Sequence, residues 1–210
     1  FVSDKCKLYS SILRACPLTQ TDAYTAYQSS FLPAATYPLP ASYIPPQRLT
    51  AIQRDVTSAF LCKMGYNQNM PWAIVFAPVE IGGAGFRSLP VEQGVGQVLL
   101  LLKHVRAGTT LGLFVLTTLE AYQLTAGISR PVLEDTRELP HTEGFWFDSV
   151  RSFLQDISGA IRLEDPWTIK PLRINDRHLM DNILEHANLT DNETCRLNRC
   201  RLFLQVTLLS

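Results

Sequence analysis

Apolar side chains recur every three or four residues along most of this chain, and turns rich in glycine or proline separate the runs. That period is typical of amphipathic α-helices. We therefore expect a mainly α-helical chain, a multi-helix, bundle-like domain with at most a small β element. Helices are predicted over residues 3–16, 21–31, 46–63, 89–106, 110–126, 145–157, 176–186 and 191–204.

Proline-rich or acidic segments are predicted to separate several of these helices. Residues 31–46 hold five prolines, which remove backbone donors and favour extended geometry, so an ordered loop is expected there. Loops are also expected over 131–143 and 161–174. Residues 72–77 form a short apolar run closed by Pro78, and this run predicts the β element, as a short strand or a buried extended segment.

Three of the predicted helices carry apolar stripes at helical spacing. The stripe of the helix over 46–63 consists of Leu49, Ile52, Val56, Ala59 and Phe60. The stripe of the helix over 89–106 consists of Val91, Val95, Val98, Leu102 and Val105. The stripe of the helix over 191–204 consists of Leu197, Cys200, Leu204 and Leu208, and it is flanked by Arg196, Arg199 and Arg201. These arginines fit either a solvated, ion-paired face or a contact with nucleic acid or a partner.

A glycine-rich turn precedes the helix over 89–106. Gly82, Gly83 and Gly85 stand where the glycines of a phosphate-binding loop would stand. The segment lacks the Gly-Lys-Ser/Thr ending of a P-loop and the spacing of a dinucleotide fingerprint, so a turn with positive φ angles is the better interpretation. In the last turn of the same helix, Lys103 and Arg106 either complement the helix dipole or form a phosphate-contact patch.

Composition limits the partners without deciding among them. The 210 residues suit one domain or two small ones, and a net charge of zero gives no global basic signature. Residues 1–107 nevertheless hold nine Lys and Arg against five Asp and Glu, whereas residues 108–210 hold ten against fourteen. We expect a net-positive helical half, 1–126, and a net-acidic helical half, 127–210, within one compact unit. Both ends look cut, so a piece of a longer protein is expected.

No cofactor, metal site or membrane partner is predicted. The five cysteines are odd in number and lack tight spacing, and no His stands beside Cys195 and Cys200 at ligand spacing, so reduced core thiols fit better than zinc. The apolar run over 107–119 is too short to span a membrane. Two glycosylation sequons end at Thr190 and Thr194, where helix-cap chemistry fits better than glycosylation.

Catalytic residues are not recognisable from spacing. None of the four histidines has a nucleophile near it in sequence. A group of loop carboxylates is expected to be solvated, namely Glu134, Asp135, Glu138 and Glu143. A hydrolase or nuclease stays open as an alternative if Asp176, His178 and Glu134 converge in space.

The order of short motifs resembles one family. Along the chain stand PLTQTDAYTAYQSSFLPAATYPLP, KMGYNQNMP, AIVFAPVEIGGAGFRSL, an EQG helix that ends in KHVR, YQLTAG, FWFDSVRSFL, RINDRHLMD and LNRCRLFLQV. This order is similar to the region that follows the polymerase domain in reverse-transcriptase-like polyproteins of eukaryotic retrotransposons. The likeness covers nearly the whole chain and depends on order, since each motif is short and non-catalytic.

The resemblance implies a helical thumb or connection region that grips the template–primer duplex behind the polymerase palm. The family's Tyr/Phe-x-Asp-Asp signature is absent, so any polymerase activity belongs to an upstream domain of the same polypeptide. The implied partners are an RNA/DNA duplex and that upstream domain, and the implied location is intracellular. The implied nucleic-acid contacts are Arg48, Arg54, Lys63, Arg87, Lys103 and Arg106. The alternative from another class is a helical protein-interaction or scaffold module with no nucleic-acid role.

Overall fold

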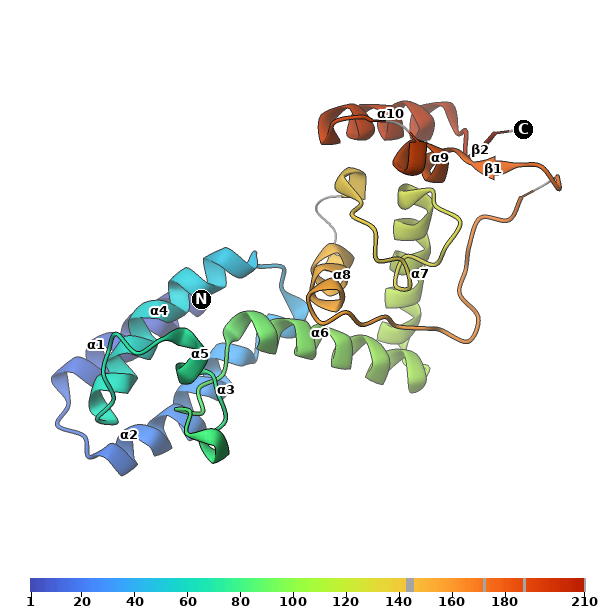
Figure 1. The fold of residues 1–210 in the computed structure, drawn as a ribbon. Helices are drawn as coiled ribbons and strands as arrows, with labels where there is room; N and C mark the ends of the chain where they lie inside the picture. Colours follow the sequence, from blue (N-terminus) through green and yellow to red (C-terminus); the bar gives the residue numbers. More distant parts are fainter. Residues whose placement is uncertain (143–145, 172, 187, 210) are drawn as a thin grey trace. The chain divides into compact units, whose positions relative to one another are not determined.

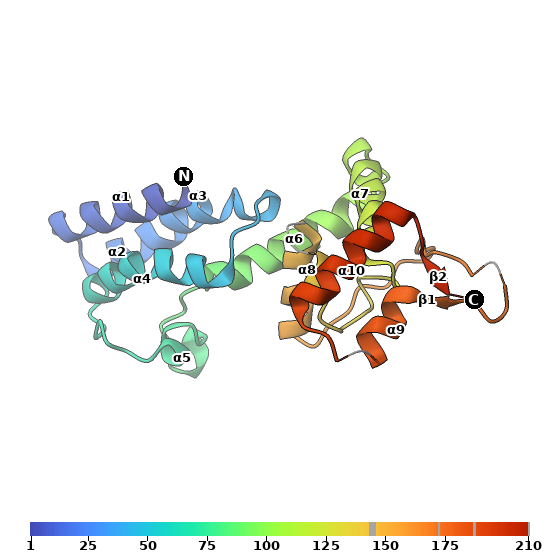
Figure 2. The same ribbon diagram turned by 90° about the horizontal axis from the view of Figure 1, so that it is seen from above.

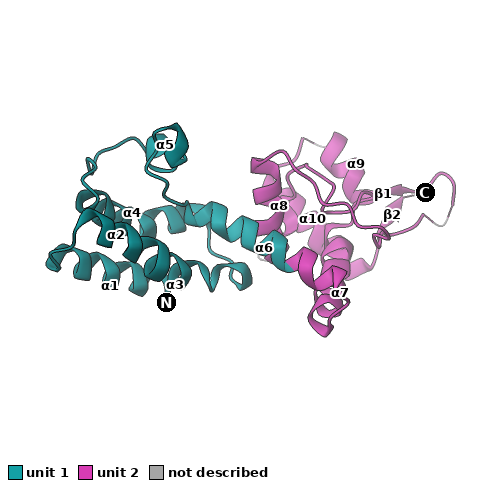
Figure 3. Ribbon diagram, turned by 90° about the horizontal axis from the view of Figure 1, so that it is seen from below, with its two compact units in different colours: residues 1–100 teal, residues 101–210 magenta. Residues whose placement is uncertain are grey.

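The structure, a computed structural model, describes residues 1–142, 146–171, 173–186 and 188–209. These residues are mainly helical and include one small antiparallel sheet of two strands, which confirms the predicted fold class (Figure 1). The chain divides into two compact units, Phe1–Leu100 and Leu101–Ser210 (Figure 3). The boundary predicted from charge, between residues 126 and 127, lies inside the second of these units.

The first unit consists of helices, and longer irregular segments, 64–71 and 82–88, lie on either side of α5 and η3 (Figure 2). Its elements are α1 (Val2–Ala15), α2 (Gln20–Ala26), the π-helix η1 (Tyr27–Phe31), α3 (Leu32–Thr36), the 3₁₀ helix η2 (Leu39–Ala41), α4 (Pro46–Lys63), α5 (Trp72–Val75), the 3₁₀ helix η3 (Val79–Ile81) and most of α6 (Leu89–Arg106). Thr19 and Asp22 form a capping box at the start of α2, in which each side chain accepts a hydrogen bond from the backbone of the other.

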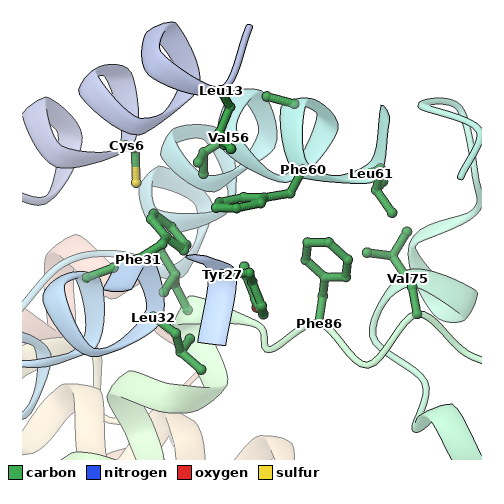
Figure 4. Close-up of a cluster of buried hydrophobic side chains, with 14 of the residues drawn as sticks. Cys6, Leu13, Tyr27, Phe31, Leu32, Val56, Phe60, Leu61, Val75 and Phe86 are labelled. Atoms are coloured by element: carbon green, nitrogen blue, oxygen red, sulfur yellow. The ribbon is translucent and has the colours of Figure 1, made fainter. Parts of the chain in front are cut away.

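An aromatic cluster forms the core of the first unit (Figure 4). Tyr27 stacks with Phe31 at 5.8 Å between ring centroids and meets Phe60 of α4 edge-on at 5.2 Å. Phe86, from the segment before α6, lies 4.5 Å from the Tyr27 ring. Val75 of α5 is buried in the same cluster. The core therefore fixes both α5 and the start of α6 to α4.

Two predicted segments differ from the structure. Within 31–46, the short helix α3 replaces part of the predicted loop, because Pro33 falls in its first turn, where no N–H is needed. Residues 72–75 form a single helical turn, so the predicted strand is wrong. The carbonyl of Pro71 accepts from the amide of Val75, which closes this turn. A short apolar run does not distinguish a strand from a buried helical turn.

Helix α6 has the predicted ends but buries a different face. Val91, in the predicted stripe, is 50% exposed. The buried face holds residues at a spacing of four, namely Leu89, Gln93, Gln97 and Leu101. The side-chain amide of Gln93 donates to the carbonyl of Ile44 at 2.9 Å, and that of Gln97 donates to the carbonyl of Ser42 at 2.8 Å. Hydrogen bonds to the chain before α4 therefore orient this helix.

The second unit contains the sheet. Its elements are α7 (Thr110–Ala126), the 3₁₀ helix η4 (Pro140–Thr142), α8 (Trp146–Asp156), β1 (Arg177–His178), α9 (Leu179–His186), α10 (Asp191–Leu204) and β2 (Leu208–Leu209). Strands β1 and β2 pair antiparallel, with Arg177 opposite Leu209. Helix α7 starts at the predicted Thr cap and ends at Gly127, whose φ is +66°. Glu143 and Phe145, which the sequence places in the loop and in helix α8, lie outside the described residues.

Helix α9 begins at Leu179, three residues later than predicted, and β1 takes the positions before it. Asp176 does not cap the helix, because its carboxylate accepts from the backbone N–H of Arg173 at 3.0 Å and closes a turn. Helix α10 begins as predicted. Thr190 caps it in a capping box with Glu193. This confirms the helix-cap interpretation of the glycosylation sequon that ends at Thr190.

The C-terminal end of α7 is the polar centre of the second unit. Arg201 of α10 is only 2% exposed and donates to the carbonyls of Leu124 and Thr125 at 2.9 and 2.8 Å. Nε2 of His141 lies 3.0 Å from the carbonyl oxygen of Ala126. These contacts satisfy carbonyls that the last turn of a helix leaves without partners, and a cation is favourable there.

The apolar stripe predicted for α10 is wrong, because polar contacts decide which face of this helix is buried. Leu197 and Leu204 are 41% and 65% exposed. The buried face of this helix holds Thr194, Asn198 and Arg201. A Cβ at Gly127 would lie 2.7 Å from the guanidinium carbon of Arg201, so the glycine that ends α7 also makes room for the arginine. The polar contacts, not the leucines, set the orientation of α10.

Candidate nucleic-acid interface

The six cations that the resemblance assigns to nucleic acid belong to both units. Arg48 and Arg54 lie on α4 and are exposed. Six residues along a helix correspond to about 120° around its axis, so the two side chains do not share a face. Within the described part of the chain, neither forms an ion pair.

Lys63 and Arg87 are engaged by their own unit. The ammonium of Lys63 donates to the carbonyl of Cys16 at 2.8 Å, which joins the end of α4 to the turn after α1. The guanidinium of Arg87 lies 3.5 Å from the carboxylate of Glu92, and the backbone N–H of Arg87 donates to the hydroxyl of Tyr27 at 2.8 Å. Burial raises the pKa of Tyr27 to about 12, so this hydroxyl stays protonated near neutral pH.

Lys103 and Arg106 lie in the last turn of α6, in the residues assigned to the second unit. Both are exposed, and their separation of three places them on one side of the helix. Nδ1 of His104, between them, lies 3.0 Å from the hydroxyl of Thr109, which caps α7. The histidine is thus occupied by the link between two helices, and the two cations are left facing solvent.

A hollow of about 510 Å³ lies beside Arg54 in the first unit. Its walls come from α4, from the loop after it and from α5, through Arg54, Asp55, Ser58, Leu61, Gln68, Asn69, Met70, Pro71, Trp72 and Val75. Leu61 and Val75 are buried and belong to the core shown in Figure 4. The other wall residues are mostly polar, so the hollow combines a fixed base with an open polar rim.

The glycine turn holds α5 in place beside this hollow. The amide of Phe86 donates to the carbonyl of Val75 at 3.1 Å, so the chain after the turn runs back against α5. A Cβ at Gly83 would meet the carbonyl oxygen of Ala77 at 2.0 Å, which requires glycine there. Gly82 has a φ of +85°, which confirms the predicted positive-φ turn.

Trp72 gives the hollow an aromatic wall. Its ring lies 5.2 Å from that of Phe76 with an interplanar angle of 17°, so the two rings stack. Trp72 is still 40% exposed. Arg54, Asp55 and Asn69 are exposed around it, and they bring a cation, a carboxylate and an amide to one rim. The chemistry of this set suits a planar polar group better than a bare anion, since the carboxylate of Asp55 would repel an anion.

A charge cluster in the second unit was missed by the sequence analysis. The guanidinium of Arg137 pairs with the carboxylates of Asp135 at 2.6 Å, Asp181 at 2.5 Å and Glu185 at 3.2 Å. Asp135 is 5% exposed, so the expectation that it is solvated is wrong. Burial acts to raise the pKa of Asp181, but hydrogen bonds from Ser129 and Arg137 outweigh it and hold that pKa below its usual value. The cluster joins the 135–137 loop to α9 and is structural.

The residues of the hydrolase alternative are each bound to a different neighbour. Nε2 of His178 lies 2.8 Å from the carbonyl of Ile169, and Glu134 lies 3.5 Å from Arg162. Asp176 closes the turn before β1. The hollow that His178 helps to line is not bordered by Asp176 or Glu134. The geometry gives this alternative no support.

Three further predictions concern the cysteines, a metal site and a membrane span. All five cysteines are free, but only Cys6 is buried, and burial raises its pKa to about 11. Cys62 and Cys200 are exposed, so the prediction of core thiols is wrong for these two. The described residues include no group of His, Cys, Asp and Glu that could hold a metal ion. No single described helix is both long and apolar enough to cross a membrane, although α6 and α7 meet the criteria as a broken pair.

No protein-family model, curated protein or solved structure matches this chain. The features of the chain that bear on its function are the order of its motifs and the arrangement of the side chains described above.

Proposed function

We propose that this chain is a non-catalytic, thumb- or connection-like module of a retroelement reverse transcriptase, and that it contacts template–primer nucleic acid. The proposal starts from the order of the motifs. The observation that carries it further is that four of the six predicted cations are exposed and hold no ion pair with a described residue, namely Arg48, Arg54, Lys103 and Arg106.

Two of the six predicted contacts already have partners within the first unit. Lys63 donates to a backbone carbonyl and Arg87 lies beside Glu92, so a phosphate would compete with these partners for part of each side chain's donors. The four remaining cations carry the expected interaction with phosphates. Such contacts are independent of sequence and release counterions, and about four of them give a slope of log K against log salt of about −3 to −4.

Fluorescence anisotropy of an RNA–DNA heteroduplex tests this proposal with the whole chain. Binding is expected to weaken steeply between about 50 and 200 mM salt. Two double variants, Arg48→Ala with Arg54→Ala and Lys103→Ala with Arg106→Ala, should each reduce the slope by about 2. A matched control, Lys7→Ala with Arg14→Ala, removes two exposed cations of α1 that have no assigned role.

The control distinguishes binding through the four proposed cations from binding through any exposed cations. If the α1 variant lowers the slope as much as the other two, exposed cations contribute wherever they lie on the chain, and the proposed surface is wrong. If the folded chain does not bind the heteroduplex even at low salt, nucleic-acid contact is removed as its own function.

Exposed apolar side chains favour the second candidate, a protein-interaction module. Leu99 of α6 is 60% exposed, and Leu113 and Phe114 of α7 are 62% and 69% exposed. Where such side chains gather in a contiguous patch, they mark contact with another polypeptide. The polymerase domain of the same polypeptide is the partner that the resemblance implies, so this candidate explains the result if nucleic-acid binding is absent.

A further inference from the structure

The hollow beside Arg54 differs from the other cationic positions, because a charged side chain lies there next to an aromatic ring, that of Trp72, whose position is fixed by its neighbours. We propose that it binds one unpaired nucleobase of a strand that continues from the duplex, with the base stacked on Trp72. This inference rests on the proposed function and deepens it, since it names the feature of the nucleic acid that the first unit recognises.

The aromatic wall is held in place before any ligand binds. Stacking on Phe76 fixes one side of the Trp72 ring, and the backbone of α5 is bonded to the chain after the glycine turn. Val75, three residues further on, is 1% exposed in the core. An aromatic side chain that is fixed and still 40% exposed offers stacking area at little cost in conformational entropy.

The polar rim matches the edge of a base. Asp55 presents carboxylate acceptors, Asn69 presents an amide that both donates and accepts, and Arg54 presents guanidinium donors. In the described part of the chain these three side chains hold no hydrogen bond or ion pair, so they are available to a ligand. Arg54 can also bind the phosphate of the same nucleotide. The negative charge of Asp55 disfavours a further anion beside it.

Size and access favour a single base over a duplex. The volume of about 510 Å³ falls within the range of about 300–1,000 Å³ that is typical of small-ligand sites. A paired base is stacked on its neighbours and has its Watson–Crick edge occupied, so its ring cannot reach Trp72. A nucleotide in a single-stranded extension has both its face and its edge free. The hollow therefore selects a duplex with an overhang over a blunt one.

The test compares a blunt RNA–DNA heteroduplex with the same duplex that carries a single-stranded RNA extension, using the whole chain. We expect tighter binding to the extended duplex. Trp72→Ala should weaken that binding about 5- to 100-fold and leave blunt-duplex binding unchanged, whereas Trp72→Phe should restore most of the difference. A 2-aminopurine in the extension reports stacking directly through quenching, which Trp72→Ala should relieve.

A second variant guards against loss of folding. Asn69→Ala removes an exposed rim group without touching the core, and it should also reduce the preference for the extension. Trp167→Ala removes an exposed tryptophan of the second unit and should not change it. Equal affinity for the blunt and extended duplexes overturns this inference and leaves the proposed function intact. A preference that both Trp72→Ala and Asn69→Ala retain also overturns it, and absence of all binding overturns both proposals.

Discussion

At the scale of single residues, Arg201 shows how far a charged side chain can depart from its expected place. The sequence groups it with Arg196 and Arg199 on a flank, yet the structure buries it against the end of α7. Burial lowers its pKa, and its contacts with backbone carbonyls and with Asn198 offset the lost hydration. Of the three arginines of α10, Arg201 alone is therefore shown to join this helix to α7.

Arg201→Ala is expected to destabilise the protein strongly. The change removes the donor that the part-buried carbonyls of Leu124 and Thr125 share, and we expect a cost of about 1–3 kcal/mol. Urea unfolding followed by circular dichroism gives the free energy of unfolding. Arg199→Ala, on the exposed part of the same helix, should change it by no more than about 0.5 kcal/mol. Equal effects of the two variants would contradict the role given to Arg201.

His141 makes stability depend on pH. Burial lowers its pKa, the positive charges of Arg201 and Arg151 act in the same direction, and the contact with Ala126 and the charge of Asp148 oppose them. Below the ordinary value of 6.5 the unfolded chain binds a proton that the folded chain does not, so stability is lost as pH falls through and below that value.

The measurement for His141 is the urea midpoint at about pH 7.5 and pH 5.5. The wild-type midpoint should fall with pH, and His141→Gln should remove a large part of the fall while it keeps a donor for the carbonyl of Ala126. His186→Gln, at an exposed position, should leave the pH dependence as it is. An unchanged pH dependence in His141→Gln would falsify the assignment.

At the scale of elements, most helix ends and the buried face of α4 were predictable, whereas the buried faces of α6 and α10 were not. Proline at the start of α4 and glycine after α7 act through local geometry, which is written in the sequence. The face that α6 buries depends on Gln97, whose partner is the carbonyl of Ser42. The hydrophobic periodicity of a sequence contains no information on such long-range hydrogen bonds.

The candidate site shows the same division. The sequence identifies Arg54 as a candidate nucleic-acid contact, whereas it places Trp72 only in a short apolar run, and the exposure of its ring is known from the structure alone. Their common hollow was not predictable, because it requires α5 to fold as a helical turn and the chain to return through Gly83. The identity of each side chain can be taken from the sequence, but whether two of them come together depends on the tertiary structure.

The glycine turn supplies a prediction at this scale. Gly83→Ala should destabilise the first unit and disturb α5, because its Cβ would meet the carbonyl oxygen of Ala77 at 2.0 Å. Gly82→Ala is the matched control, since a Cβ there meets open space and adds only the strain of a positive φ, about 1 kcal/mol. Urea unfolding measures stability, and near-ultraviolet circular dichroism reports the environment of Trp72. If Gly82→Ala costs as much as Gly83→Ala, close packing of the turn is not what requires glycine.

At the scale of the whole molecule, the charge asymmetry is weaker than the halves of the sequence suggest. The first unit, 1–100, holds seven Lys and Arg against five Asp and Glu, and the second, 101–210, holds twelve against fourteen. Lys103 and Arg106 belong to the acidic unit. Any attraction to nucleic acid therefore comes from a few exposed cations at particular sites, and the overall field of either unit contributes little.

The division into units also predicts an autonomous fragment. The hydrophobic cluster of the first unit draws its residues from Val2 to Leu89, so a chain that ends at Arg106 keeps that core and the whole of α6. We expect this fragment to be helical and to unfold cooperatively in urea, with an m-value of about 1–3 kcal/mol/M. A fragment that ends at Ser88 is the control. It lacks the amide of Leu89 that donates to Gln53 at 2.8 Å, as well as the helix that follows, and it should be markedly less stable. If the longer fragment unfolds without a cooperative transition, the first unit needs the second in order to fold, and the two units are parts of one domain.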